Sequence, residues 1–139
     1  MRVGVVGASY ASGTHLPVYA ELAAGGVVEL VAVATAHRET ADAVAAKFDV
    51  PHAHVGFEGL CADPDVDLVD IATRPSRHRA MAEAAFAAGT SGYVSRDASP
   101  DALLKSVLDT VRGKVSLGKT ATLAILNLTG APGKSKAKT

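Results

Sequence analysis

The chain lacks tryptophan, and aromatic residues make up only 4% of its 139 residues. The hydrophobic core must therefore be built from valine, leucine and alanine, which belong to the 48% of the sequence that is hydrophobic. Cys61 is the only cysteine, so the chain cannot form an internal disulfide. A single unpaired cysteine fits a reducing compartment, and we expect a cytoplasmic protein.

Net charge is also absent, because 14 basic residues balance 14 acidic ones. This balance argues against nucleic acid or an anionic membrane as the main partner. No apolar run reaches the length of a membrane span. Met1 and Arg2 lead directly into an apolar strand pattern, so we expect no signal peptide.

The sequence alternates short β-rich runs with helical patterns about five times. This alternation predicts an α/β fold of three layers, with a doubly wound parallel sheet of five strands in the order 3-2-1-4-5. A ligand is then expected at the switch point between the first and fourth strands. The expected strands are 2–8, 29–35, 51–55, 67–73 and 93–96, and the expected helices are 14–24, 39–48, 57–61, 76–88 and 99–112.

The loop after the first strand, GASYASG (7–13), is the first candidate binding site. Gly7 occupies the first position of the dinucleotide fingerprint G-x-G-x-x-G, but Ser9 stands at the second glycine. A helix N-terminus suits a pyrophosphate because its N–H groups are free. The residues predicted to contact a cofactor here are Gly7, Ser9, Tyr10, Ala11 and Ser12. The alternative is a plain turn between strand and helix.

The end of the second strand predicts which dinucleotide would bind. An acidic residue there binds the ribose of NAD, whereas a nearby arginine suits the 2′-phosphate of NADP. This chain has Thr35 in place of an acid and Arg38 three residues later, which favours NADP. A solvated helix start is the alternative explanation for Arg38.

Two further patterns predict no site. The stretch GKVSLGKT (113–120) matches the phosphate-loop spacing, but a helix precedes it where that mechanism requires a strand, so we attribute the match to chance. His52 and His54 lie two residues apart on one face of a short strand. With no third ligand near them in sequence, we interpret them as exposed edge-strand histidines and expect no metal.

Residues 1–89 resemble the nucleotide-binding domain of the Gfo/Idh/MocA oxidoreductase family. The resemblance rests on the loop at 7–13 and above all on DPDVDLVDIATRPSRHRAMAEAAFAAG (63–89). It implies that the loop after the fourth strand flanks the nicotinamide end of the cofactor, with Thr73, Arg74, Pro75 and His78 as contacts. The family's catalytic Glu-Lys-Pro motif occurs nowhere in the sequence.

Residues 87–117 resemble instead the last strand and helix of LuxR-type response-regulator receiver domains. The motif GYVSRDASP (92–100) and the leucine-rich helix after it carry this resemblance. The receiver's acidic pair and phospho-acceptor aspartate have no counterpart here. These two partial signatures favour a chimeric, engineered scaffold that is a hybrid of Rossmann-like and flavodoxin-like folds. Such a scaffold would be a recombinant product rather than a natural cytoplasmic protein.

The functional prediction follows from what each resemblance lacks. We expect no enzyme, and either residual NADP(H) binding or no cofactor. The alternatives are an NADP-dependent oxidoreductase cofactor domain and a receiver-like interaction module. Self-association through edge strand 93–96 or helix 99–112 is the expected partnership. Residues 1–128 are predicted to form one domain, with a Rossmann-like part (1–89) and a receiver-like part (90–128), and residues 129–139 a disordered tail.

Overall fold

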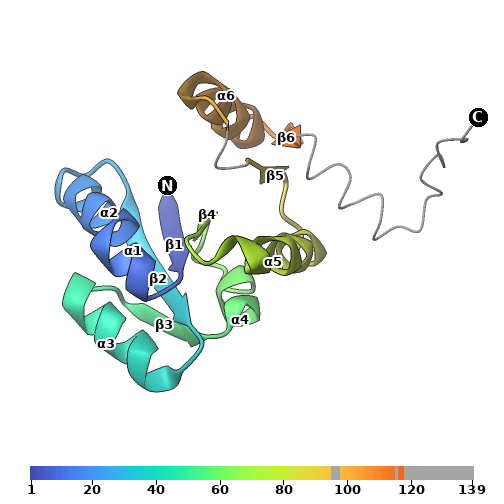
Figure 1. The fold of residues 1–139 in the computed structure, drawn as a ribbon. Coiled ribbons are helices and arrows are strands. Elements are labelled where there is room, and N and C mark those ends of the chain that lie inside the picture. Colours follow the sequence, from blue (N-terminus) through green and yellow to red (C-terminus); the bar gives the residue numbers. More distant parts are fainter. Residues whose placement is uncertain (95–97, 115, 118–139) are drawn as a thin grey trace, which may run out of the picture. The chain divides into compact units, whose positions relative to one another are not determined.

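The computed structural model describes residues 1–94, 98–114 and 116–117 (Figure 1). The chain divides into two compact units, Met1–Ala84 and the part from Ala85 onward. The interpretation of residues 1–128 as one domain stays a prediction, and the expected tail lies outside the described residues.

The first unit is built on a parallel sheet of four strands in the order β3-β2-β1-β4. The strands are β1 (Arg2–Val6), β2 (Glu29–Thr35), β3 (His52–Val55) and β4 (Leu68–Ile71). Both β2 and β4 pair with β1. The predicted fold class and the order of the first four strands are confirmed.

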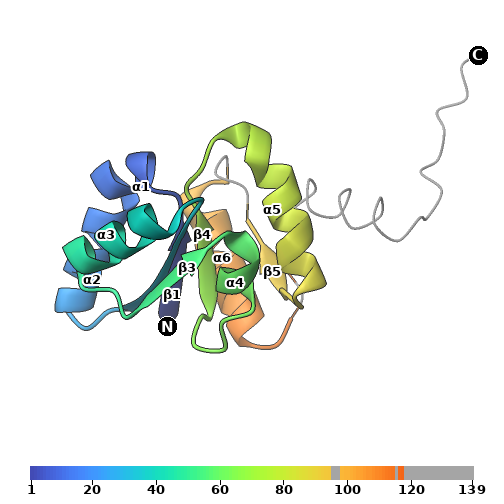
Figure 2. The same ribbon diagram turned by 90° about the horizontal axis from the view of Figure 1, so that it is seen from below.

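Helices cover both faces of this sheet (Figure 2). The helices α2 (His15–Ala24) and α3 (Arg38–Phe48) lie on one face, and α4 (Phe57–Cys61) lies on the other. The short helix α1 (Ser9–Gly13) precedes α2, and α5 (Pro75–Ala87) follows β4. The sequence suggests Ser76 as the N-cap of this helix. Since α5 begins at Pro75, Ser76 instead lies inside the helix.

Aliphatic side chains form the core, as the shortage of aromatic residues predicts. The largest fully buried side chains are Leu16, Leu60, Val3, Val5 and Val33. Leu60 brings α4 against the middle of the sheet, where a Cβ atom at Gly4 would lie 2.8 Å from the Leu60 Cδ1 atom. A glycine in β1 therefore lets this helix pack closely on the strand.

In the described part of the second unit, a separate two-stranded parallel sheet accompanies the helix α6 (Pro100–Val111). The strand β5 (Gly92–Tyr93) pairs with β6 (Ser116–Leu117), and α6 connects them. Ser99 caps α6 as predicted, with its Oγ accepting a hydrogen bond from the Ala102 N–H at 3.2 Å.

The observed strand β5 therefore differs from the predicted fifth strand. Among the described residues of this stretch, Gly92 and Tyr93 have strand geometry, and they pair with Ser116 and Leu117 rather than with β4. The strand β6 was not predicted, since two residues are too few to show a periodicity. Residues 95 and 96, which were expected to complete this strand, lie outside the described residues.

Backbone hydrogen bonds at the Gly7 turn link the carboxyl ends of β1, β2 and β4. Its N–H donates to the Ala34 carbonyl at 3.0 Å, and the Ala72 N–H donates to the Val6 carbonyl at 2.9 Å. Gly7 has φ of +126°, and a Cβ atom there would lie 2.3 Å from the Ala72 carbonyl oxygen. Only glycine combines this backbone conformation with so close an approach.

Substituting Gly7→Ala should lower the free energy of unfolding by about 2–4 kcal/mol, because the methyl group meets backbone and the φ angle becomes strained. Gly13→Ala is the matched control, since its Cβ would meet nothing within 4 Å. It should change the stability by less than about 1 kcal/mol. Urea unfolding of both variants measures the difference, and equal midpoints would contradict the role assigned to Gly7.

An ion-pair cluster closes the opposite end of β1 and β4. Asp67 accepts hydrogen bonds from the Arg2 backbone N–H at 2.9 Å and from the Arg2 Nε and Nη2 atoms at 3.2 and 3.1 Å. Arg2 Nη1 donates to Asp65 at 3.0 Å. The hydrogen bonds from Arg2 hold the pKa of Asp67 below its ordinary value.

This shift predicts how stability depends on pH. A carboxyl group whose pKa is lower in the folded state adds stability above its unfolded pKa of about 3.9, and that contribution is lost as the pH falls below it. The difference in unfolding free energy between the wild type and Asp67→Asn should be constant from about pH 5 to 7 and shrink below about pH 4. Urea titrations across this range measure it, with the exposed Glu21→Gln as control for loss of one surface carboxylate. A difference that grows in acid would overturn the assignment.

Candidate functional site

The candidate site lies at the carboxyl edge of the parallel sheet, where the strand order reverses between β1 and β4. Ligands of open α/β sheets bind at such switch points. Three segments follow the strands at this edge: 7–13 after β1, 35–38 after β2 and 72–78 after β4. Every cofactor contact predicted from the sequence belongs to one of them.

The segment after β1 offers backbone donors and small side chains. The first N–H groups of a helix have no partner inside it, and Ala8 at the N-cap of α1 supplies no side-chain cap. Ser9 and Tyr10 are exposed and Ser12 is half-buried. Ala11 is fully buried, so its side chain packs in the core and only its backbone belongs to the edge.

The segment after β2 carries the candidate phosphate-binding arginine. Thr35 is buried, and its hydroxyl donates to the His37 carbonyl at 2.8 Å, which shapes the turn into α3. The Arg38 Nη1 atom donates to the Ala53 carbonyl at 2.9 Å and to Asp42 at 3.2 Å. The exposed fraction of the Arg38 side chain is 59%, so a ligand can reach it.

The segment after β4 is held by its own side chains. His78 Nε2 donates to the Thr73 carbonyl at 2.8 Å, because a carbonyl can only accept. The Thr73 hydroxyl contacts the Met81 sulfur at 3.5 Å. Arg74 and Pro75 are exposed. His78 thus positions the loop, while Arg74 is the side chain that reaches solvent.

The structure brings the first and third segments into contact. A Cβ atom on Gly7 would lie 3.6 Å from the Thr73 Cγ2 atom. Arg38 differs, since its side chain extends toward Ala53 of β3 rather than toward β1. The three segments therefore follow one another along the edge in the order of the strands β2, β1 and β4. Arg38 lies after β2, and the Gly7 turn lies in the middle, after β1.

A partly buried aspartate that the sequence analysis missed, Asp70, fastens α2 to β4. Asp70 Oδ2 accepts hydrogen bonds from His15 Nδ1 at 2.7 Å and from the Tyr19 hydroxyl at 2.9 Å. Burial and the Asp70 charge raise the pKa of Tyr19. His15 thus contributes a side-chain hydrogen bond to the contact between α2 and β4. The available signal was a lone acid inside the apolar strand LVDI (68–71).

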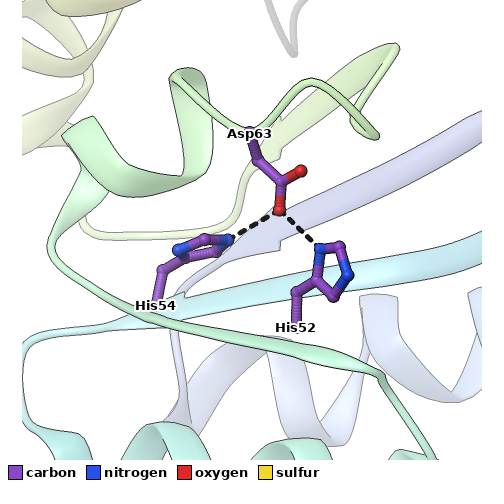
Figure 3. Close-up of side chains that lie close together, drawn as sticks. All are labelled: His52, His54 and Asp63. Carbon is purple, nitrogen blue, oxygen red and sulfur yellow. Dashed lines mark hydrogen bonds and ion pairs between the residues drawn. The ribbon is translucent and has the colours of Figure 1, made fainter.

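A second missed aspartate joins the two histidines of β3 (Figure 3). Asp63 Oδ2 accepts hydrogen bonds from His52 Nδ1 at 2.7 Å and from His54 Nε2 at 2.8 Å. Its other oxygen accepts the Asp65 N–H at 2.9 Å. These hydrogen bonds outweigh the effect of burial and lower the pKa of Asp63 to about 2. The interpretation of His52 and His54 as exposed is wrong, because both are half-buried and both donate to Asp63.

The fold and this edge define a class of protein, the dinucleotide-binding Rossmann domains. The family model described as "Oxidoreductase family, NAD-binding Rossmann fold" matches residues 1–94. The chain belongs to this family, Gfo/Idh/MocA. No curated protein sequence matches the chain.

Solved structures extend this comparison. An NAD-binding oxidoreductase from Klebsiella pneumoniae is 25% identical, with a TM-score of 0.63 over 96% of this chain. A levoglucosan dehydrogenase in complex with NADH is 27% identical over 65% of the chain, with a TM-score of 0.58. A biliverdin reductase from Synechocystis sp. PCC 6803, in complex with biliverdin and NADP+, is 29% identical over 84%, with a TM-score of 0.53. The chain covers 40%, 26% and 36% of these three structures, respectively.

These findings correct two predictions. The expectation that the chain is no enzyme is overturned, because its relatives are dehydrogenases and reductases. The chimera and the receiver segment gain no support, since the Klebsiella oxidoreductase matches across 96% of the chain. Among the described residues, no helix is long and apolar enough to cross a membrane.

Removing the Asp63 carboxylate should destabilise the first unit even without any ligand. With chelator present, Asp63→Ala should lower the unfolding free energy by about 1–3 kcal/mol, because three donors lose their acceptor. Asp65→Ala removes an exposed carboxylate two residues away and should cost less than about 1 kcal/mol. Urea unfolding at neutral pH compares them, and equal costs would show that the buried bonds to Asp63 add nothing.

Proposed function

We propose that this chain is the dinucleotide-binding part of an NAD(P)-dependent oxidoreductase. The observation that carries the proposal is the family match over residues 1–94, which includes the Gly7 turn at the switch point of the sheet. The bound nicotinamide would supply a hydride acceptor or donor. The residues of this chain would bind and orient it.

The pyrophosphate would bind at the segment from Gly7 to Ser12. The first turn of α1 carries no side-chain cap, so its N–H groups are free to donate to phosphate oxygens. Ser9 stands where the fingerprint has its second glycine, and its exposed hydroxyl offers a further donor. The donor set therefore fits a phosphate group, although its glycine spacing departs from the fingerprint.

Arg38 would select NADP over NAD. The segment 35–38 has no carboxylate to accept from a ribose 2′-hydroxyl, and Arg38 is the exposed cation at this position. A 2′-phosphate would compete with Asp42 and the Ala53 carbonyl for the guanidinium. A doubly charged phosphate is the stronger partner for a guanidinium. Relatives are known with either NADH or NADP+, so the family alone does not decide the cofactor.

The nicotinamide end would lie against Thr73, Arg74 and Pro75. The hydrogen bond from His78 to the Thr73 carbonyl fixes this loop beside Gly7. A substrate carbonyl or hydroxyl would need a proton donor or acceptor as well. The Glu-Lys-Pro motif that carries the lysine in this family is absent from the sequence. We therefore assign the binding and orientation of the cofactor to this chain and assign no proton-transfer group.

A self-association role for α6 stays a prediction alongside this function. Four aliphatic side chains on α6 are exposed, namely Leu103, Leu104, Leu108 and Val111. An apolar helix face of this kind suits a second copy of the chain. The other expected contact, strand 93–96, lies partly outside the described residues.

The cofactor assignment predicts the effect of one charge removal. Arg38→Gln should raise the dissociation constant of NADPH about 10-fold or more and change that of NADH less than about 2-fold, because only NADPH carries the 2′-phosphate. Arg79→Gln is the matched control, since Arg79 is also exposed and also pairs with an acid four residues away. Fluorescence titration of both cofactors measures the four constants.

Two outcomes would contradict the proposal. If neither cofactor saturates the wild type, the binding function itself fails. If Arg38→Gln and Arg79→Gln weaken NADPH equally, the effect is one of general charge and Arg38 does not recognise the phosphate.

A further inference from the structure

The cluster of His52, His54 and Asp63 lies away from the dinucleotide edge and has no part in the proposed function. It sits on β3, the outer strand, which β2 separates from β1 and its glycine turn. All three side chains point into the same space between β3 and the segment after α4 (Figure 3). Two imidazoles and a carboxylate that point at one another are groups that can bind a metal ion.

Three features of the chain build the cluster. His52 and His54 share one face of β3, since alternate residues of a strand point to the same side. The turn at Gly56, with φ of +82°, leads into α4, after which Asp63 folds back toward the strand. Gly59 leaves room for the His54 ring, because a Cβ atom there would lie 3.2 Å from His54 Nδ1.

The three groups present metal-ligand atoms at one point. Nδ1 of His52, Nε2 of His54 and a carboxylate oxygen of Asp63 all lie within 4.8 Å of one another. Both histidines direct their ring nitrogens at the same atom, Asp63 Oδ2. The Asp65 N–H occupies Oδ1 and thereby fixes the plane of the carboxylate. Two imidazoles and a carboxylate form a common donor set for zinc.

We propose that His52 Nδ1, His54 Nε2 and Asp63 Oδ2 bind one Zn²⁺ ion, with water as the fourth ligand. In this state the metal takes the place of the two ring protons that now face Asp63, and each neutral imidazole carries its proton on its other ring nitrogen. Bonds of about 2.0–2.1 Å in a tetrahedral site place ligand atoms roughly 3.3 Å apart. The present separations of 2.7 and 2.8 Å would therefore open by only about half an ångström, which small rotations of the side chains supply.

The surroundings of the cluster suit a metal ion that enters from solvent. The His52 side chain is 38% exposed and the His54 side chain 25%, whereas Asp63 is 4% exposed. The carboxylate is thus a fixed anion at the base of the site, and His52 is the accessible side. Asp65 Oδ2 lies 3.8 Å from the other nitrogen of His52. A carboxylate beside the outer nitrogen orients a metal-bound histidine and raises its basicity.

The proposed ion would act as a structural clip. It would join β3, which pairs with β2 alone, to the connection between α4 and β4. It would stabilise the folded chain by a free energy that grows with the logarithm of the zinc concentration divided by the dissociation constant. The site does not share a residue with the proposed cofactor contacts, so cofactor affinity provides an independent measurement.

The test uses the full chain without an affinity tag, stripped of metal by chelation and titrated with zinc chloride. Calorimetry and elemental analysis after dialysis should give one Zn²⁺ per chain, and zinc should raise the midpoint of thermal unfolding. His52→Gln, His54→Gln and Asp63→Asn should each lower the affinity by about 10-fold or more. His37→Gln is the matched control, because His37 is exposed and lies outside the cluster.

Cobalt provides a second readout that does not depend on the stability of a variant. The wild type with Co²⁺ should show the intense visible bands of a tetrahedral site, and His54→Gln should lose them. Circular dichroism in chelator confirms that each variant is folded. The proposal is overturned if the wild type takes up no stoichiometric zinc, or if His54→Gln and His37→Gln bind it equally.

Discussion

The close approach of β1 to β4 at Gly7 is the constraint on which the rest of the structure depends. β1 pairs on both sides, with β2 and with β4. At its carboxyl end the chain must leave the sheet within reach of the Ala72 carbonyl, and glycine is the residue that permits this. The same turn opens the α1 segment toward the switch point. One backbone requirement thus serves both the sheet and the proposed binding site.

Three aspartates fasten the first unit around that sheet, each in a different way. Asp67 closes the amino end of β4 against Arg2, in solvent. Asp70, within β4, holds His15 and Tyr19 of α2. Asp63 holds both histidines of β3. The two partly or fully buried carboxylates each satisfy two donors with a single oxygen, which offsets the cost of burying the charge.

The first unit could be predicted closely because its signals are local. The strand at Glu29–Thr35 and the helix at Phe57–Cys61 have the expected bounds, since apolar runs and turn residues mark both ends. The second unit was predicted less well. The sequence pattern predicts a strand at 93–96, but no local pattern indicates which strand it will pair with. The resemblance to a receiver rested on the same short stretch.

The fold class, the aliphatic core and the three segments at the carboxyl edge could be predicted from the sequence alone. The positions of strands and helices follow from periodicity, and the strand order follows from the handedness of crossovers. The hydrogen bonds of Asp63 and Asp70 became visible only in the folded structure. Asp63 lies nine residues from His54, and Asp70 lies 55 residues from His15. No periodicity links such pairs, since their contact depends on how packed elements bring distant side chains together.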